Sequence, residues 1–170
     1  MKKIFWCLAS MTILLTTGGC WLLQHPAPRP DEAYDLAPAA KQTGYSCRFS
    51  RIRNLSPAGR KMLCRHADNR ISESPASWVQ DPESLLARYL AGSFPVTPDA
   101  PQISVTILRF ELDLARSQAV LSAELAAGAK IQRRIFTADL QNTSGADASR
   151  AMTLCAEKLV QTIITMIQEK

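Results

Sequence analysis

Residues 102–114 read Gln-Ile-Ser-Val-Thr-Ile-Leu-Arg-Phe-Glu-Leu-Asp-Leu, and this stretch decides the fold. Ile103, Val105 and Ile107 alternate with other residues, which predicts a β-strand with one buried face. From Leu108 the apolar residues change phase and point to the opposite side. Either a bulge near Ile107 resets the register, or the strand is central and partly buried on both faces.

Further strand-like stretches lie on both sides of this one, at residues 45–52, 60–66, 69–74, 119–125 and 130–140. The last two are joined to residues 102–114 and to each other by short turns, so we expect an antiparallel meander. The first two flank the turn-forming sequence at residues 56–59, which reads Ser-Pro-Ala-Gly, and are best explained as two strands joined by a turn.

Two helices complete the pattern. Residues 81–83 combine an aspartate suited to an N-cap, a proline at the first helical position and an early acid, so a short helix is expected after Trp78, ending near Gly92. An apolar stripe following Asp147 or Ser149 predicts a C-terminal helix of about 20 residues. The fold class is therefore α+β, with a mostly antiparallel sheet of about five to six strands and both helices on one face.

The N-terminal residues 1–19 have the organisation of an export signal, with Lys2 and Lys3, a short apolar run and then small residues. The run has about a dozen residues, whereas a membrane-spanning helix needs ~20. The sequence Thr-Gly-Gly-Cys that ends at Cys20 resembles a lipobox. Cys20 is thus the predicted lipidation site and the first residue of the mature chain; ordinary secretion is the alternative.

Lipidation would fix the protein to a membrane, since each buried CH₂ contributes about 0.8 kcal/mol and two or more chains hold firmly. By resemblance to sorting in Gram-negative bacteria, Trp21 in place of aspartate implies the periplasmic face of the outer membrane. Residues 20–43 are rich in proline and are predicted to be a tether. Residues 44–170 are then a single domain, because about 150 mature residues suffice for one core.

Charge and cysteine content restrict the remaining functions. The formal net charge of +5 falls to about +3 without the signal peptide, which does not indicate a nucleic-acid partner. Cys47, Cys64 and Cys155 allow three pairings, of which Cys47 with Cys64 is the preferred disulfide. Cys155 falls on the apolar stripe of the last helix, where a buried free thiol is expected.

No catalytic, metal-binding or cofactor-binding motif stands out in the sequence. His25 lies in the tether, and His66 has no identifiable nucleophile beside it. The cysteines lack the close pairs of zinc sites, and there is no glycine-rich phosphate loop. We therefore expect a protein that is not an enzyme and that uses no cofactor or metal.

Two features are candidates for contact with a partner. Arginines and one lysine are concentrated before residue 66, at Arg48, Arg51, Arg53, Arg60, Lys61 and Arg65. They form either a solvated strand face or a patch for anionic lipid headgroups or an acidic protein. Trp78 either packs in the core with its N–H bonded to a carbonyl, or contacts a partner.

The mature chain resembles the auxiliary lipoproteins of ABC-type lipid transport systems. The resemblance is carried by the lipobox, the proline-rich spacer with Tyr34-Asp35-Leu36, the arginine-rich first strand, the tryptophan before a capped helix at residues 72–90, the strand containing Phe110, and the long C-terminal helix. It implies a non-catalytic component, anchored in the outer membrane, that docks onto an MCE-type periplasmic protein carrying phospholipid. Homo-oligomers are also implied.

Two other functions compete with this interpretation. A carrier of a small hydrophobic ligand would enclose it in a cavity lined by residues such as Phe110, Leu112 and Ile135. An exported hydrolase would need a positioned nucleophile near His66.

Overall fold

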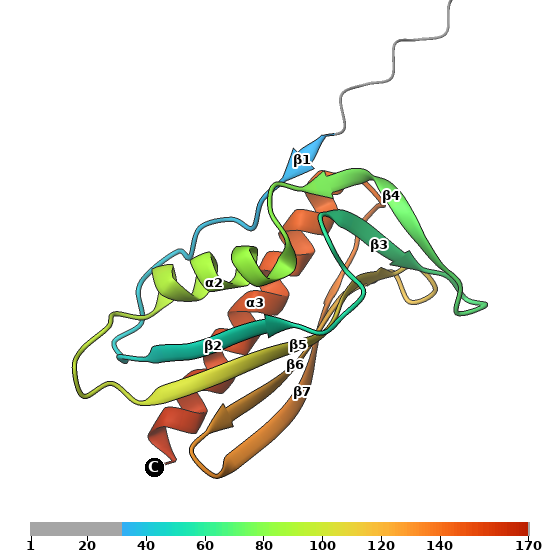
Figure 1. The fold of residues 1–170 in the computed structure, drawn as a ribbon. Coiled ribbons are helices and arrows are strands. Elements are labelled where there is room, and N and C mark those ends of the chain that lie inside the picture. Colours follow the sequence, from blue (N-terminus) through green and yellow to red (C-terminus); the bar gives the residue numbers. More distant parts are fainter. Residues whose placement is uncertain (1–31, 170) are drawn as a thin grey trace, which may run out of the picture. The chain divides into compact units, whose positions relative to one another are not determined.

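The computed structural model describes residues 32–169, which form seven strands and two helices (Figure 1). In chain order these are β1 (Ala33–Tyr34), β2 (Arg48–Asn54), β3 (Lys61–Arg65), β4 (Ile71–Trp78), α2 (Pro82–Ser93), β5 (Gln102–Asp113), β6 (Gln118–Ala127), β7 (Lys130–Asp139) and α3 (Gly145–Gln168). The predicted signal peptide, Cys20 and most of the proline-rich segment lie outside the described residues. The fold class is α+β, as predicted, with more strands than expected.

The strands form one mixed sheet in the order β1-β4-β3-β5-β6-β7, and β2 also pairs with β5. β5, β6 and β7 make the predicted antiparallel meander. A bulge lies in the β5–β6 ladder between Ile107 and Arg109, so the first of the two alternatives for residues 102–114 is correct. The additional residue returns Phe110 and Leu112 to the face of Ile107, and all three are buried.

The predicted hairpin between the first two strands is wrong. β2 and β3 both run parallel to β5, with β2 beside residues 102–107 and β3 beside residues 112–113. Asn54 sets this offset: its side chain donates to the Ala58 carbonyl at 2.6 Å and accepts from the Ser56 amide at 3.0 Å. These bonds stabilise the loop between β2 and β3, and after this loop the chain continues in the same direction as before. A turn-forming sequence does not distinguish such a detour from a reversal.

β4 is longer than the predicted strand at residues 69–74 and continues through Pro75. It pairs antiparallel with β3, and the register of that ladder shifts between Lys61 and Leu63, opposite Pro75. A proline is tolerated at such an irregularity because no ladder hydrogen bond requires its missing N–H.

Both helices were predicted, but one start differs. Asp81 caps α2 by accepting from the Ser84 amide at 3.0 Å, as expected. α3 starts earlier than predicted, because Ser144 is its N-cap and accepts from the Asp147 amide at 3.2 Å. Asp147 instead accepts from the amides of Gln141 and Asn142, which closes the loop before the helix.

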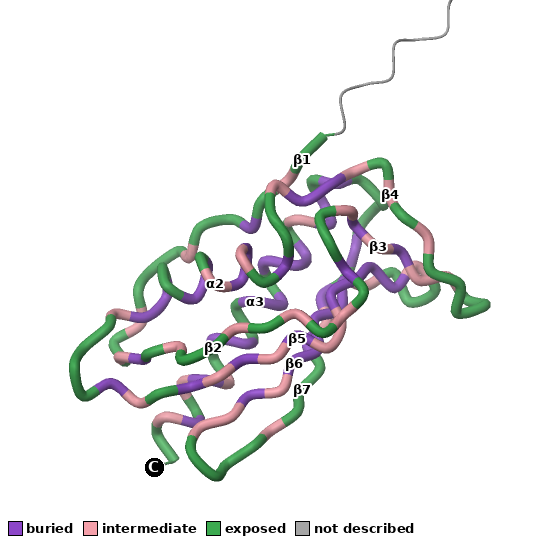
Figure 2. The backbone as a smooth tube through the Cα atoms, viewed as in Figure 1, coloured by how far each residue is buried: buried purple, intermediate pink, exposed green. Residues whose placement is uncertain are grey.

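The core lies between the helices and one face of the sheet. α2 contacts β2 and β5, α3 contacts β6 and β7, and the two helices touch each other. In Figure 1, α3 runs behind the strands, and Figure 2 shows buried residues concentrated where helices and strands meet. The β6 residues directed toward α3 are fully buried, namely Ala119, Leu121, Ala123 and Leu125.

The domain begins before the predicted boundary at residue 44. β1 pairs with β4, and Leu36 is buried in the core. Further along, the Ala37 amide donates to Thr153 Oγ1 at 3.0 Å, and the Thr43 amide donates to the Ser93 carbonyl at 2.7 Å. The segment from residue 32 onward is therefore part of the domain, and the rest of the predicted tether lies outside the described residues.

Candidate docking surface

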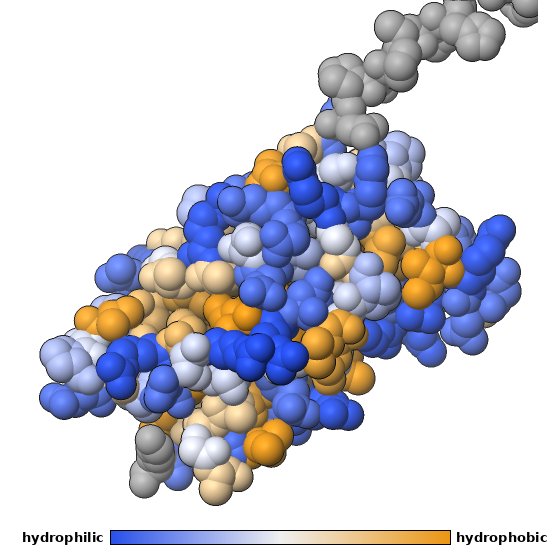
Figure 3. All heavy atoms as spheres, in the orientation of Figure 1, coloured by the Kyte–Doolittle hydropathy of each residue, from blue (hydrophilic) through white to orange (hydrophobic). Residues whose placement is uncertain are grey.

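The face of the sheet opposite the helices, called the open face below, carries alternate residues of four strands. One row across β2, β5, β6 and β7 contains Arg51, Ser104, Ala126 and Ile131, and the next contains Arg53, Thr106, Glu124 and Arg133. Successive strand residues point to opposite faces, so these side chains point away from the core. Figure 3 shows hydrophilic and hydrophobic residues interspersed over these strands.

Three arginines of β2 lie on this face, including the two predicted as partner contacts. Arg48 is registered with Gln102, Arg51 with Ser104 and Arg53 with Thr106, on alternate residues of β5. In a regular strand, residues three positions apart such as Arg48 and Arg51 point to opposite faces of the sheet. The bulge after Phe49 adds one residue and so brings both side chains to the same face. All three are exposed and form no ion pair with any of residues 32–169, so their charge is available to a partner.

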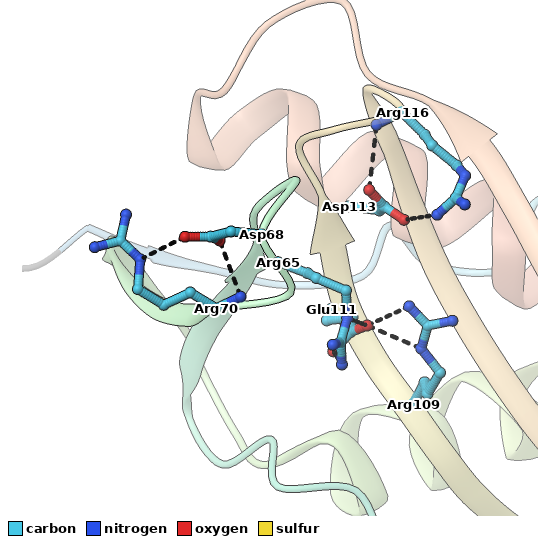
Figure 4. Close-up of polar contacts among 7 residues, drawn as sticks. All are labelled: Arg65, Asp68, Arg70, Arg109, Glu111, Asp113 and Arg116. Atoms are coloured by element: carbon cyan, nitrogen blue, oxygen red, sulfur yellow. Dashed lines mark hydrogen bonds and ion pairs between the residues drawn. The ribbon is translucent and has the colours of Figure 1, made fainter.

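A buried carboxylate organises the centre of the open face (Figure 4). Arg65 donates to both oxygens of Glu111, from Nε at 2.7 Å and from Nη2 at 3.1 Å, and Arg109 Nε donates to Oε1 at 2.8 Å. Burial favours the protonated form, but the bonds from Arg65 and Arg109 outweigh it and hold the pKa of Glu111 below its usual range. Two guanidinium groups on one carboxylate leave a net positive charge at fixed positions.

A second buried carboxylate lies at the end of β5, where it stabilises the turn into β6. Asp113 accepts from Arg116 Nη1 at 2.7 Å (Figure 4). Arg116 itself is largely exposed. Its positive charge is balanced by Asp113, so this pair adds no net charge to the open face.

Exposed apolar side chains lie on the opposite margin of the same face. Ile131 and Ile135 on β7 are 64% and 63% exposed and flank Arg133. Near the start of β5, a shallow depression of about 370 Å³ is lined by Ser50, Gln102, Ser104, Ala126 and Gly128. The open face thus combines free arginines, exposed isoleucines and a polar depression, which suits contact with another macromolecule.

Trp78 does not take part in this surface. It is 1% exposed and packs edge-on against Phe110, with ring centroids 5.3 Å apart, so a direct partner contact is wrong. Its Nε1 has no hydrogen-bond partner among the described residues, so the expected bond to a carbonyl is absent as well.

The preferred disulfide is not formed. Cys47 and Cys64 are both free and buried, as is Cys155. Cys47 directly precedes the start of β2 beside Gln102, whereas Cys64 is registered with Leu112. About ten residues of β5 separate these points, or roughly 33 Å, and a disulfide needs Cα atoms within about 7 Å. Burial raises the pKa of the Cys47 thiol to about 11, so it is not reactive near neutral pH.

The structure brings Ser72 to His66, a pair that the sequence did not suggest. Ser72 Oγ lies 2.8 Å from His66 Nε2 across the β3–β4 hairpin. Asp68 binds the Arg70 amide at 3.0 Å and no described residue orients the other ring nitrogen of His66. A serine and a histidine without such an orienting group lack the third component of a hydrolytic triad.

The residues proposed to line a ligand cavity do not meet. Phe110 and Leu112 are buried beneath the helices, whereas Ile135 is exposed on the open face. Within residues 32–169 no cluster of histidine, cysteine and acidic side chains could hold a metal ion. Over the same residues no helix has the length and apolar character to cross a membrane.

Comparisons with known proteins agree at the level of fold. No family model matches the sequence, and a comparison with characterised proteins gives no significant match. Among solved structures, an uncharacterized protein is similar over 82% of this chain and 97% of its own, with a TM-score of 0.56 and 16% identity. A Xanthomonas campestris protein of the DUF330 family is similar over 78% of this chain and 92% of its own, with a TM-score of 0.51 and 15% identity. This chain therefore shares its fold with uncharacterized proteins.

Proposed function

We propose that this chain is an outer-membrane lipoprotein that faces the periplasm and serves as a non-catalytic docking component of an ABC/MCE-type lipid transport system. The observation that carries the proposal is the open face, where Arg51 and Arg53 are exposed without ion pairs to the described residues on one margin, and Ile131 and Ile135 are exposed on the other. Exposed apolar residues combined with free charge on one face are typical of an interaction surface.

Three further observations support this function. The lipobox at Cys20 and the residue after it predict an anchor in the outer membrane. The order of motifs along the chain resembles the auxiliary lipoproteins of these transport systems, and the fold is similar to that of a DUF330 protein. Docking also requires no catalytic residues. The partner that the resemblance implies is an MCE-type periplasmic protein.

The docking role is tested by reversing the free charges. We expect the double substitution Arg51→Glu with Arg53→Glu to abolish cross-linking to the MCE-type protein in native membranes. Mass spectrometry of the cross-linked products identifies the partner and measures the loss. Arg70→Glu is the control for a charge reversal elsewhere, because it makes the change of one of the two substitutions on the β3–β4 hairpin and should leave cross-linking unchanged. Equal cross-linking by both variants would refute docking through the open face.

The anchor is tested separately. Labelled palmitate should be incorporated into the protein, and Cys20→Ala should remove the label and release the protein from the outer-membrane fraction. Cys7→Ala is the control, because Cys7 lies within the apolar run, and this substitution should change neither the labelling nor the membrane fraction. Retention of the Cys20→Ala protein in the outer membrane would rule out the lipid anchor.

A further inference from the structure

β7 is the terminal strand of the sheet, so one of its two edges has no strand from residues 32–169 beside it. It pairs with β6 from Lys130 opposite Ala127 through to Asp139 opposite Gln118. In a hairpin with a two-residue turn, the residues next to the turn exchange hydrogen bonds, and bonded pairs then alternate with non-bonded pairs. Even-numbered residues of β7 therefore direct their backbone groups to β6, and odd-numbered residues direct theirs outward.

Helix α3 covers only one half of this outward edge. Lys158 Nζ donates to the Thr137 carbonyl at 2.5 Å, and Arg150 Nη2 donates to the Asp139 carbonyl at 3.5 Å. Both carbonyls belong to odd-numbered residues, as the alternation requires. The outward N–H and C=O groups of Ile131, Arg133 and Ile135 have no such partner within residues 32–169.

The uncovered half of the edge also carries two exposed isoleucines. The side chains of Ile131, Arg133 and Ile135 all lie on the open face, and each is about two-thirds exposed. Sheet edges are ordinarily protected by shortness, by proline, by charged side chains or by a covering element. β7 has 10 residues without a proline, and α3 bonds only to the carbonyls of Thr137 and Asp139, at the end away from the β6–β7 turn. The charged residues of the other half are all basic, so they oppose a basic strand but not an acidic one. A strand added here would pair with three residues and bury both isoleucines.

We propose that residues 131–135 of β7 bind one extended strand of a partner protein, which carries an acidic residue between two apolar residues at alternate positions. The apolar residues of that strand would pack on Ile131 and Ile135, and its acidic residue would face Arg133. The surroundings carry an excess of positive charge, which favours an acidic strand. Lys130 pairs with Glu169 and Arg133 with Glu124, but Arg134 and Lys158 form no ion pair with any of residues 32–169. This proposal rests on the docking function above and specifies the chemistry of the partner.

Amide hydrogen exchange tests the proposal directly. The probe is a synthetic peptide, blocked at both ends, whose centre reads Val-Thr-Glu-Thr-Val, added to the full mature chain in mild detergent. Exchange should slow at the amides of Ile131, Arg133 and Ile135 and stay unchanged at Gln132 and Arg134, whose amides already bond to β6. The same peptide with its inward amides N-methylated should have no effect, because it cannot donate to the β7 carbonyls.

Substitutions then separate the contributions of the side chains. Ile131→Lys with Ile135→Lys should weaken peptide binding about tenfold or more, since the peptide no longer buries two isoleucines. Val96→Lys is the control, because Val96 is equally exposed but lies in the loop after α2. Arg133→Glu should reverse the charge preference, so that a peptide with lysine at its centre binds better than the one with glutamate.

Three outcomes would overturn the proposal. Unchanged exchange at the three amides under saturating peptide would mean that this edge does not accept a strand. Equal binding of the glutamate and lysine peptides by the unmodified protein would refute an acidic partner. Slowing that appears without peptide and grows with protein concentration would identify a second copy of this chain as the occupant. The peptide result does not depend on Cys20, Arg51 or Arg53, so its failure and that of the proposed function are distinguishable.

Discussion

The ring of Tyr34 lies against Gly145, the first residue of α3, so closely that a Cβ on the glycine would overlap the ring carbons. Tyr34 belongs to β1, and its carbonyl accepts from the Val79 amide at 2.9 Å. The Glu32 carbonyl accepts from the Ser77 amide at the same distance. The absence of a side chain at Gly145 therefore allows the Tyr34 ring, and with it β1, to pack at the start of α3.

We expect Gly145→Ala to detach β1 while the rest of the domain stays folded. The partly exposed Tyr34 ring can swing outward, which would open the hydrogen bonds that the amides of Ser77 and Val79 donate to this segment. Exchange at the amides of Ser77 and Val79 should then accelerate about tenfold, equivalent to about 1.4 kcal/mol of local stability. Gly92→Ala in α2 is the control, because nothing lies near its Cβ position. Equal exchange in both variants would show that this packing does not hold β1.

The Glu111 cluster predicts a large difference between two carboxylates of the same face. Glu111→Gln should lower the free energy of unfolding by roughly 2 kcal/mol, because two guanidinium groups lose a buried, hydrogen-bonded anion. Glu124→Gln should cost less than about 1 kcal/mol, since its partner Arg133 is largely exposed to water. Urea denaturation measures both losses, and equal losses would mean that burial of Glu111 has no energetic consequence.

The parts of the fold that the sequence predicts are those with local signals. The meander follows from alternation and short turns, and α2 follows from the cap and proline at residues 81–82. The detour between β2 and β3 was not predictable, because it depends on side-chain bonds of Asn54 and on pairing with β5, which lies about fifty residues further along.

The residues of the candidate docking surface could be predicted from the sequence only in part. Arg48 and Arg51 were recognised by charge, but their common face results from a bulge that no single-strand pattern shows. Ile131 was not recognised as a surface residue, because an isoleucine in a strand ordinarily indicates core. Its position on the last strand of a meander was the available signal, since such a strand has a free edge. Trp78 was ambiguous because the sequence before a helix does not reveal whether a ring faces inward.

Asp147 makes stability sensitive to acid. Burial raises the pKa of this carboxyl, but the amides of Asn142 and Gln141 and the Arg150 guanidinium outweigh that effect and lower it. A lowered pKa in the folded state means that the stabilisation is complete above the unfolded pKa of about 3.9 and is lost as the pH falls below it. The urea midpoint should therefore decrease between about pH 5 and pH 2. Asp147→Asn should flatten this decrease, and an unchanged slope would contradict the role of Asp147.

Two turn residues with positive φ predict opposite effects on stability. Ser117, between β5 and β6, has φ 51°, and Gly128, between β6 and β7, has φ 62°. Left-handed backbone is strained for serine and unstrained for glycine. Ser117→Gly should therefore raise the free energy of unfolding by about 0.5 kcal/mol, after the greater entropy of glycine in the unfolded chain is subtracted.

Gly128→Ala should lower the free energy of unfolding by about 1 kcal/mol. Nothing lies within 4 Å of the Cβ position at Gly128, so this loss would come from backbone conformation alone and not from a clash. Urea midpoints measure both effects, provided that the slope of the transition is unchanged. If Ser117→Gly also destabilised the protein, the serine hydroxyl or the entropy of the unfolded chain would outweigh the strain, and left-handed backbone would not limit stability at this turn.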